Sequence, residues 1–358
     1  MRLYIAFCAT LFSLLSFANG KVAYSICGSV EGIDGEYVYL YECDKQETID
    51  SAVVADGKFR INGTYGRKAY VRVFSGELYS FCVLDEGITV VDFNSHVPQS
   101  GSKANMALRE LMNFEDSYYE NIDRLREEIQ NSGLSTDSSH AARNALFDKL
   151  KSGYVEYLRK AILDNLDNGT AEYALRMYSS YCTSEQWDSI YAALPETTKN
   201  IYAVQQVGRI FAGQRRTSVG KPFVDFTAKN VDGSEARLSD YVGRGKYVLV
   251  DFWASWCGPC IQESKETIMP LYEKYRNADN FEILGVDAWD KPEAAKKAIE
   301  RLGYEWNQLI DTGGIKLMEE YGFDGIPMII LFAPDGTIAA RGLRGRDITE
   351  TVERFIAK

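Results

Sequence analysis

One stretch near the C-terminal end constrains the fold more than any other, because a strand-like apolar run leads into two closely spaced cysteines. Residues Tyr247–Trp253 are apolar except for Asp251, and such a run is typical of a central strand buried on both faces of a sheet. After three more residues comes Cys257-Gly258-Pro259-Cys260, where Pro259 suits the first turn of a helix. We predict a buried strand followed directly by a helix.

Strands and helices alternate through the rest of this region. The pattern predicts, in order, a helix from the cysteines to about Asn277 with a kink at Pro270, a strand at 281–286, a helix at 292–302, a short helix at 314–321, strands at 328–332 and 337–341, and a helix at 349–357. For residues 217–358 we therefore predict an α/β fold, a mixed central sheet with helices on both faces.

Two different patterns precede this region. Between residues 21 and 98, β-branched and aromatic runs alternate with turn signals such as Asp56-Gly57, which predicts a small antiparallel β domain. Its expected strands are 23–30, 37–41, 51–55, 58–62, 69–74 and 88–93. Between residues 101 and 215, apolar residues recur every three or four positions, which predicts a helical segment with helices at 141–163, 171–181, 184–193 and 196–212 after a first one near 103–131.

The first twenty residues have the composition of a secretory signal peptide. Arg2 supplies a positive charge, Leu3–Phe17 is mostly apolar, and Ala18-Asn19-Gly20 ends in small residues. A retained membrane anchor is the alternative, but the apolar run is shorter than the ~20 residues that span a bilayer. We expect export to the periplasm or cell envelope, where disulfides persist.

Composition excludes a nucleic-acid partner. The chain of 358 residues has a net charge of −11 and no cluster of Lys and Arg, whereas binding to phosphate backbones depends on such clusters. The apolar fraction of 46% is ordinary for a globular protein.

The spacing of Cys257 and Cys260 suits redox chemistry. A helix N-terminus stabilises a thiolate on the first cysteine, and the second lies one turn away, within reach of a disulfide. Half of a zinc site is the alternative, but such sites need four ligands, and the two histidines, His96 and His140, are far away. We expect no metal and no cofactor other than the redox-active disulfide itself.

Four further cysteines remain after removal of the signal peptide: Cys27, Cys43, Cys82 and Cys182. They are scattered, and their apolar or aromatic surroundings favour buried, inert thiols. A Cys27–Cys43 disulfide is the alternative, since sequence alone does not fix the pairing.

The segment from Val250 to Cys260 closely resembles the active-site segment of thioredoxins, and Ile326-Pro327 resembles the cis-proline of that family. Upstream, Gly220–Phe226 with Leu238–Tyr241 looks like the extension shared by peroxiredoxins and the extracytoplasmic thioredoxins of the TlpA/ResA type. The resemblance covers about residues 219–358. It implies a thioredoxin-like fold, with the β domain and helical segment as an accessory region.

The resemblance also implies roles for individual residues. Cys257 would attack the substrate, Cys260 would resolve the mixed disulfide, and Asp251, six residues before Cys257, would be the buried acid that exchanges a proton with Cys260. The residues implied to line the substrate site are Trp256, Gly258, Pro259, Ile326 and Pro327. Apolar neighbours on both sides of Asp251 favour its burial and a raised pKa.

One position departs from the family pattern. Thioredoxins have a lysine on the second strand near the buried acid, whereas residues 281–286 here contain only Glu282 as a charged residue. The exact role of Asp251 is therefore open.

The sequence thus predicts an exported thiol–disulfide oxidoreductase. The Gly-Pro pair and Ile326 resemble reducing members, so we expect a reductase of disulfide-containing envelope proteins that is supplied with electrons by a membrane donor. Two alternatives remain. A thiol peroxidase normally has a threonine where Ala254 stands, three residues before Cys257. A non-enzymatic envelope-binding module would have no use for the dithiol and Asp251.

Overall fold

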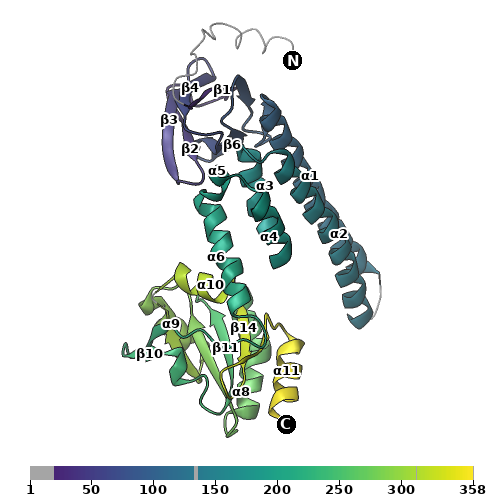
Figure 1. The fold of residues 1–358 in the computed structure, drawn as a ribbon, viewed down its shortest axis with the longest axis vertical. Coiled ribbons are helices and arrows are strands. Elements are labelled where there is room, and N and C mark those ends of the chain that lie inside the picture. The colour runs from purple at the N-terminus through teal and green to yellow at the C-terminus, as the bar shows by residue number, and fades with distance from the viewer. Residues whose placement is uncertain (1–19, 133–135, 312, 358) are drawn as a thin grey trace. The chain divides into compact units, whose positions relative to one another are not determined.

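The computed structural model describes residues 20–132, 136–311 and 313–357, so nearly all of the predicted signal peptide lies outside the described residues. The chain forms two compact units that divide between Gln205 and Gln206, within helix α6 (Tyr202–Arg216) (Figure 1). No helix in the described part of the chain is both long and apolar enough to cross a bilayer.

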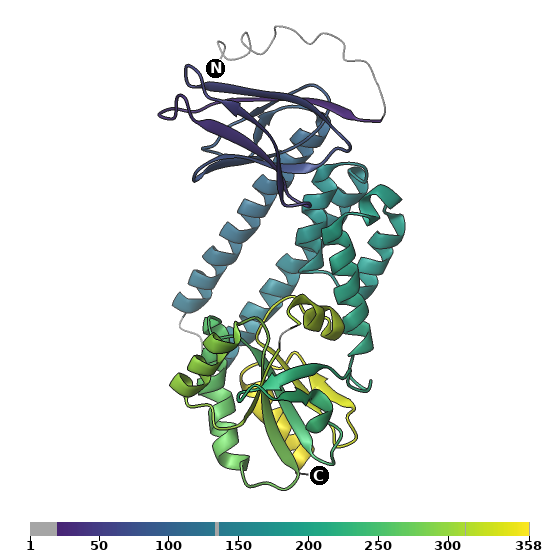
Figure 2. The same ribbon diagram turned by 90° about the vertical axis from the view of Figure 1, so that its left-hand side faces the viewer.

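The first unit begins with a sandwich of two four-stranded sheets, in the orders β4-β1-β7-β8 and β3-β2-β5-β6 (Figure 2). The strands are β1 (Val22–Ser29), β2 (Tyr37–Glu42), β3 (Glu47–Val53), β4 (Lys58–Tyr65), β5 (Tyr70–Ser75), β6 (Leu78–Val83), β7 (Ile88–Val91) and β8 (Pro98–Ser100). The predicted antiparallel β domain is confirmed, with one parallel pair between β1 and β7.

Alternate residues of both sheets fill the space between them. Ile26 and Ile61 from one sheet meet Leu40 and Val73 from the other in a single buried cluster. Two strands, β6 and β8, are absent from the prediction. β6 has an exposed first residue, Leu78, and β8 has only three residues, so neither shows a clear alternation of its own.

Six helices complete this part of the chain: α1 (Lys103–Asn131), α2 (Thr136–Asp164), α3 (Gly169–Ser179), α4 (Ser184–Ala193), α5 (Glu196–Lys199) and α6. The single helix predicted at 196–212 is divided at Asn200 and Ile201. The reason lies in the β domain, where the Asp44 carboxylate accepts hydrogen bonds from the Tyr202 and Ala203 amides at 3.1 and 3.0 Å and so caps α6.

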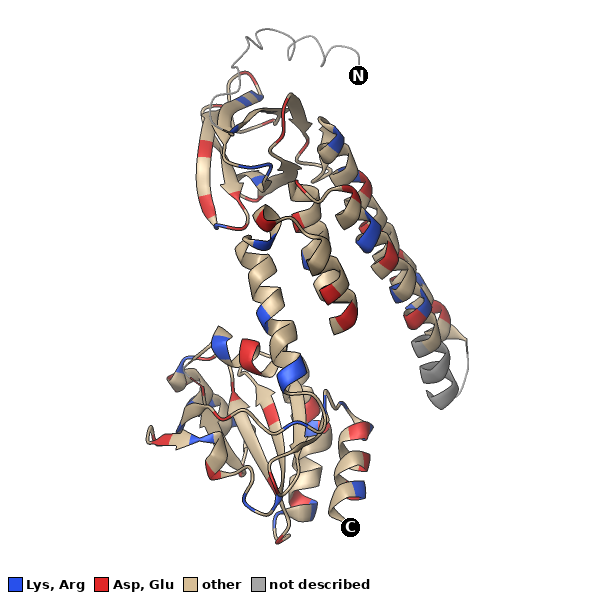
Figure 3. Ribbon diagram, in the orientation of Figure 1, with Lys and Arg blue, Asp and Glu red and all other residues tan. Residues whose placement is uncertain are grey.

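Charged residues of both signs occur along α1 and along the described part of α2 (Figure 3). Most of their ion pairs join residues one turn apart at the surface, as Arg126 and Asp123 do at 2.9 Å. A different arrangement lies under the β domain. The Arg67 guanidinium binds both the Glu42 and the Glu172 carboxylates, which are buried, and so joins β2 to α3.

The second unit contains a seven-stranded mixed sheet in the order β10-β9-β13-β12-β11-β14-β15. Its strands are β9 (Thr227–Asn230), β10 (Glu235–Arg237), β11 (Tyr247–Trp253), β12 (Phe281–Asp287), β13 (Asn307–Ile310), β14 (Met328–Phe332) and β15 (Ile338–Arg341). β11 pairs with β12 in parallel and with β14 antiparallel. The predicted mixed sheet is confirmed.

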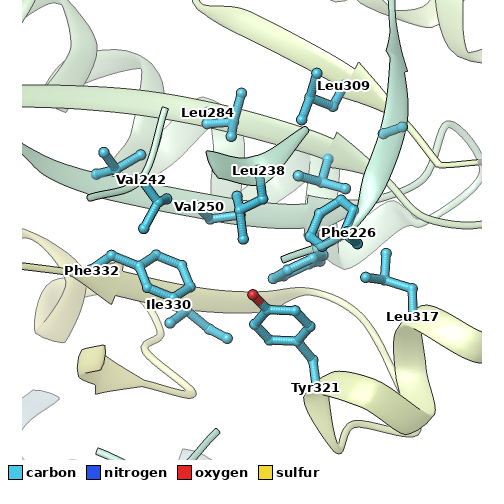
Figure 4. Close-up of a cluster of buried hydrophobic side chains, with 14 of the residues drawn as sticks. Phe226, Leu238, Val242, Val250, Leu284, Leu309, Leu317, Tyr321, Ile330 and Phe332 are labelled. Carbon is cyan, nitrogen blue, oxygen red and sulfur yellow. The ribbon is translucent and has the colours of Figure 1, made fainter. Parts of the chain in front are cut away.

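Each face of this sheet has its own apolar core. Val250 and Phe252 point into one cluster with Tyr321 of α10 (Ile315–Tyr321) and η1 (Leu238–Asp240) (Figure 4). Leu249 and Trp253 point into the other, beneath α9 (Pro292–Leu302) and α11 (Arg346–Ile356). Helices therefore cover both faces, as the sequence predicts.

The helix after β11 is irregular. It comprises α7 (Gly258–Glu263), a π-helical turn η2 (Ser264–Ile268) and α8 (Met269–Tyr275). The Met269 amide donates to the Ser264 carbonyl, five residues back, and Pro270 follows without an amide hydrogen. The irregularity expected at Pro270 therefore takes the form of a π-turn just before it.

The Arg67 cluster yields a stability prediction. Arg67→Ala leaves the Glu42 and Glu172 carboxylates buried without their cation, so we expect the free energy of unfolding of the first unit to fall by about 3 kcal/mol. Urea denaturation of the full chain, followed by hydrogen exchange in peptides from β1–β5, measures this. Arg126→Ala is the control, because its exposed ion pair should contribute less than about 0.5 kcal/mol. Equal losses in the two variants would contradict the prediction.

Candidate active site

The two cysteines lie at the end of β11, where the sheet gives way to a helix. Cys257 is the N-cap of α7, and it forms a disulfide with Cys260. The Cys260 amide, a free amide of the first turn of the helix, donates to the Cys257 sulfur at 3.2 Å. After reduction, the same amide and the helix dipole would stabilise a thiolate on Cys257.

The segment before β14 returns to this end of the sheet because β14 runs antiparallel beside β11. The peptide bond between Ile326 and Pro327 is cis. The Ile326 carbonyl oxygen lies 3.8 Å from the Cys257 sulfur. The structure thus brings Ile326 and Cys257, which are 69 residues apart, to one side of the disulfide.

The surroundings of the disulfide differ between its two sides. Trp256, Gly258 and Pro259 are exposed, whereas both cysteines and Pro327 are buried. Access to the Cys257 sulfur is therefore confined to the surface formed by the residues next to it in the chain and by the cis-proline segment.

Asp251 lies on the buried side. It belongs to β11, and because strand residues alternate between faces, it shares a face with Leu249 and Trp253, whose cluster also contains Cys257 and Cys260. Its side chain is 2% exposed, and its Oδ1 atom has no hydrogen-bond partner among the described residues. Burial raises the pKa of Asp251 to about 7.

The charged neighbours of Asp251 come from segments that the sequence analysis did not single out. The negative charge of Glu263 in α7 adds to the rise in the pKa of Asp251, and the positive charge of Arg344 opposes it. The Gly345 amide donates to both Glu263 oxygens, at 3.1 and 3.0 Å, and the Arg344 guanidinium donates to the Pro327 carbonyl. Glu282, the charge considered from the sequence, instead accepts a bond from Asn307 at 2.7 Å.

A sequence signal existed for one of these residues. Glu263 follows Cys260 by three residues, which places it one helical turn farther along the same side of α7. Arg344 has no such signal, because it precedes α11 and reaches the site only through the tertiary fold.

Two further acidic residues lie beside the active-site loop. Asp287 ends β12, in register with Trp253, and its Oδ1 atom accepts the Asp290 amide at 3.1 Å. Asp290 in turn accepts the amide and the hydroxyl of Ser255, at 2.6 and 2.9 Å. Burial raises the pKa of Asp287 to about 8, and the neighbouring Asp290 carboxyl adds to the shift. Sequence reasoning missed this pair.

Among the described residues, Cys27, Cys43, Cys82 and Cys182 form no disulfide, so the alternative Cys27–Cys43 disulfide is not formed. Cys27 and Cys82 are buried, and Cys43 and Cys182 are partly buried. Burial raises the pKa of Cys43 and of Cys182 to about 12, and it raises that of Cys82 further. Since thiolates are the reactive form, these thiols are poor nucleophiles.

Comparison with known proteins shows which family the second unit matches. Residues 219–341 match the model of the AhpC/TSA family, and residues 24–108 match a domain of unknown function, DUF4369. The thiol-disulfide oxidoreductase ResA of Geobacillus thermodenitrificans is 31% identical over 130 residues, which are 36% of this chain and 71% of that protein. ResA of Geobacillus kaustophilus is 30% identical over 148 residues, 41% of this chain and 80% of that protein.

Among solved structures, the thioredoxin domain of a thiol-disulfide oxidoreductase from Bacteroides vulgatus is 36% identical. The match covers 39% of this chain and 98% of that domain, with a TM-score of 0.36. The sequence relatives are thiol–disulfide oxidoreductases, and the Cys257–Cys260 pair after β11 is suited to the same chemistry. The chain belongs to the ResA-like thiol–disulfide oxidoreductases, with a thioredoxin-like domain of the AhpC/TSA family at its C-terminal end.

Proposed function

We propose that the chain is an exported reductase of disulfides in cell-envelope proteins that works through Cys257 and Cys260. The observation that carries the proposal is the placement of this pair, with Cys257 at the start of α7 and the cis Ile326–Pro327 segment beside its sulfur. A Gly-Pro pair between the cysteines is also that of thioredoxin, a reducing protein with a potential of about −270 mV.

The reaction is a two-step exchange. The thiolate of Cys257 attacks one sulfur of the substrate disulfide, and the other substrate sulfur leaves as a thiolate that takes up a proton. Cys260 then loses its proton and attacks Cys257 in the mixed disulfide. This releases the second substrate thiol and forms the Cys257–Cys260 disulfide, so two electrons pass from the protein to its substrate.

Asp251 supports the second step. Its carboxylate, on the same side of the sheet as the buried Cys260, would take the proton of the resolving thiol, directly or through water. Because its pKa is about 7, a substantial fraction is ionised at neutral pH, and the conjugate acid can return the proton.

The proposed direction requires partners. Each turnover leaves the Cys257–Cys260 disulfide, so a reductant must restore the dithiol, and for an exported protein we propose a membrane electron donor. A peroxidase is not favoured, because Ala254 stands in place of the threonine expected three residues before a peroxidatic cysteine.

The reduction potential of the pair tests the direction. We expect equilibration with dithiothreitol or glutathione buffers to give a value near or below about −270 mV. Cys257→Ser is the control, since it cannot form the disulfide. A potential near −120 mV, that of a strong oxidant, would instead make the protein a disulfide donor.

The order of the two steps predicts different behaviour of the two cysteine variants. Cys260→Ser should accumulate a mixed disulfide between Cys257 and a substrate, because the resolving thiol is missing. Cys257→Ser should form none, because Cys260 lies inside α7 and is 1% exposed, whereas Cys257 is the N-cap of α7 and has exposed neighbours on both sides. Mass spectrometry under non-reducing conditions measures both. Accumulation in the Cys257→Ser variant would reverse the roles.

The pKa of Asp251 predicts the pH dependence of the reaction. In Asp251→Asn we expect the rate of mixed-disulfide resolution at pH 8 to fall roughly 100-fold. The step that titrates near pH 7 in the unsubstituted protein should also vanish, and the two rates should converge in acid. Stopped-flow measurements between pH 5 and 9 test this. Glu282→Gln is the control and should keep the original profile, because Glu282 bonds Asn307 instead.

The raised pKa of Asp251 predicts that the protein becomes less stable as the pH rises. The folded-state pKa of Asp251 is about 7, above the ordinary 3.8, so its favourable contribution is complete below pH 3.8 and is lost as the pH rises through 7. Asp251→Asn should therefore be stabilised relative to the unsubstituted protein at pH 8 and less so at pH 5, as measured by urea denaturation. The opposite sign would contradict burial as the cause.

A further inference from the structure

The side chain next to the reactive cysteine belongs to an aromatic stack. Trp256 is 63% exposed, the highest value for a large apolar side chain among the described residues. Its ring stacks on that of Trp289, in the loop after β12, with a centroid distance of 6.2 Å and an interplanar angle of 22°. An exposed indole next to a reactive cysteine offers a large, rigid apolar surface to a molecule that approaches the sulfur.

The stack is fixed from behind by the core of the sheet. Trp289 contacts the edge of Phe323 at a centroid distance of 6.2 Å, and Phe323 packs on Phe252 at 5.2 Å. Phe252 is fully buried in β11. Trp289 is thus the link between the exposed ring of Trp256 and the interior.

The two loops that carry the tryptophans are also tied to each other. Ser255, just before Trp256, donates its amide and its hydroxyl to the carboxylate of Asp290, just after Trp289. Asp290 is held in turn by the carboxyl of Asp287. The segments that carry the two rings are therefore held together before any substrate arrives, which lowers the conformational entropy lost on binding.

The position of the stack indicates what would bind there. Trp256 adjoins Cys257, and Phe323 lies three residues before Ile326, whose carbonyl faces the Cys257 sulfur. The stack therefore borders the place where a substrate disulfide must lie. The Asp290 carboxylate, which accepts both hydrogen bonds from Ser255, lies beside the stack and would repel an acidic group.

We propose that Trp289 determines substrate specificity. With Trp256 it forms an aromatic shelf that binds an apolar side chain next to the substrate's disulfide cysteine, in preference to an acidic one. The inference rests on the proposed function, because it assigns a substrate class to the same dithiol. Trp289 acts by contact with the bound side chain and by supporting Trp256.

Two matched peptide disulfides test the shelf. They differ only in a Phe or a Glu beside the reactive cysteine, and hydroxyethyl disulfide, which has no flanking side chain, is the reference. We expect the reduced full chain to react about tenfold faster with the Phe peptide than with the Glu peptide. Trp289→Ala should reduce this ratio to near one, and Trp289→Phe should restore most of it.

The readout is a ratio within each variant, so a loss of folded protein lowers both rates and leaves the ratio unchanged. Val231→Ala is the matched control, because Val231 is an exposed apolar residue in the β9–β10 turn at the far edge of the sheet, and it should keep the original ratio. Equal rates with both peptides, or an unchanged ratio in Trp289→Ala, would contradict the proposed role of Trp289 in specificity and leave the proposed function intact. Failure of the unsubstituted protein to reduce any of the three disulfides would overturn the proposed function and the shelf together.

Discussion

The burial of β11 on both faces is the constraint on which the active site depends. Val250 and Phe252 belong to the core on one side of the sheet, and Leu249 and Trp253 to the core on the other. A strand enclosed in this way has no exposed face for Asp251, so its carboxyl is held in an apolar environment. The strand ends at Trp253, and a short turn leads from it to Cys257 at the start of α7, so one strand fixes the positions of both the buried acid and the reactive cysteine.

The two cysteines have different surroundings and therefore different roles. Cys260 lies on the apolar, buried side with Asp251, whereas Cys257 adjoins exposed residues. Near Asp251, burial and the charge of Glu263 outweigh the charge of Arg344, so the pKa of the carboxyl lies near neutrality, where a proton can move in either direction. At Cys257, the Cys260 amide and the start of α7 favour a thiolate, next to the exposed residues Trp256 and Gly258. Cys257 is thus suited to attack a substrate, and the more deeply buried Cys260 to resolve the mixed disulfide.

The thiols of the first unit are unreactive, and so they do not compete with Cys257 for disulfide exchange. Cys82 lies in the apolar core between the two sheets, and Cys43 packs against a separate apolar cluster that contains Tyr70 and Val83. Burial raises the pKa of each thiol well above its ordinary value. Thiolates are scarce at these positions, so thiol–disulfide exchange is concentrated at Cys257. The Arg67 ion pairs hold α3 against the β domain and so help to keep Cys43 enclosed, because Tyr173 of α3 packs against the same apolar cluster.

The sequence by itself determined the elements whose evidence is local. The apolar run of β11, the helix start at Cys257 and the burial of Asp251 all follow from the order of neighbouring residues. Only the tertiary structure decided which distant side chains meet: Asp44 at the start of α6, Arg344 near Asp251, and Asp290 at Ser255. Periodicity reports which face of an element is buried, whereas a contact between two elements depends on register and packing across the whole core, which no local pattern contains.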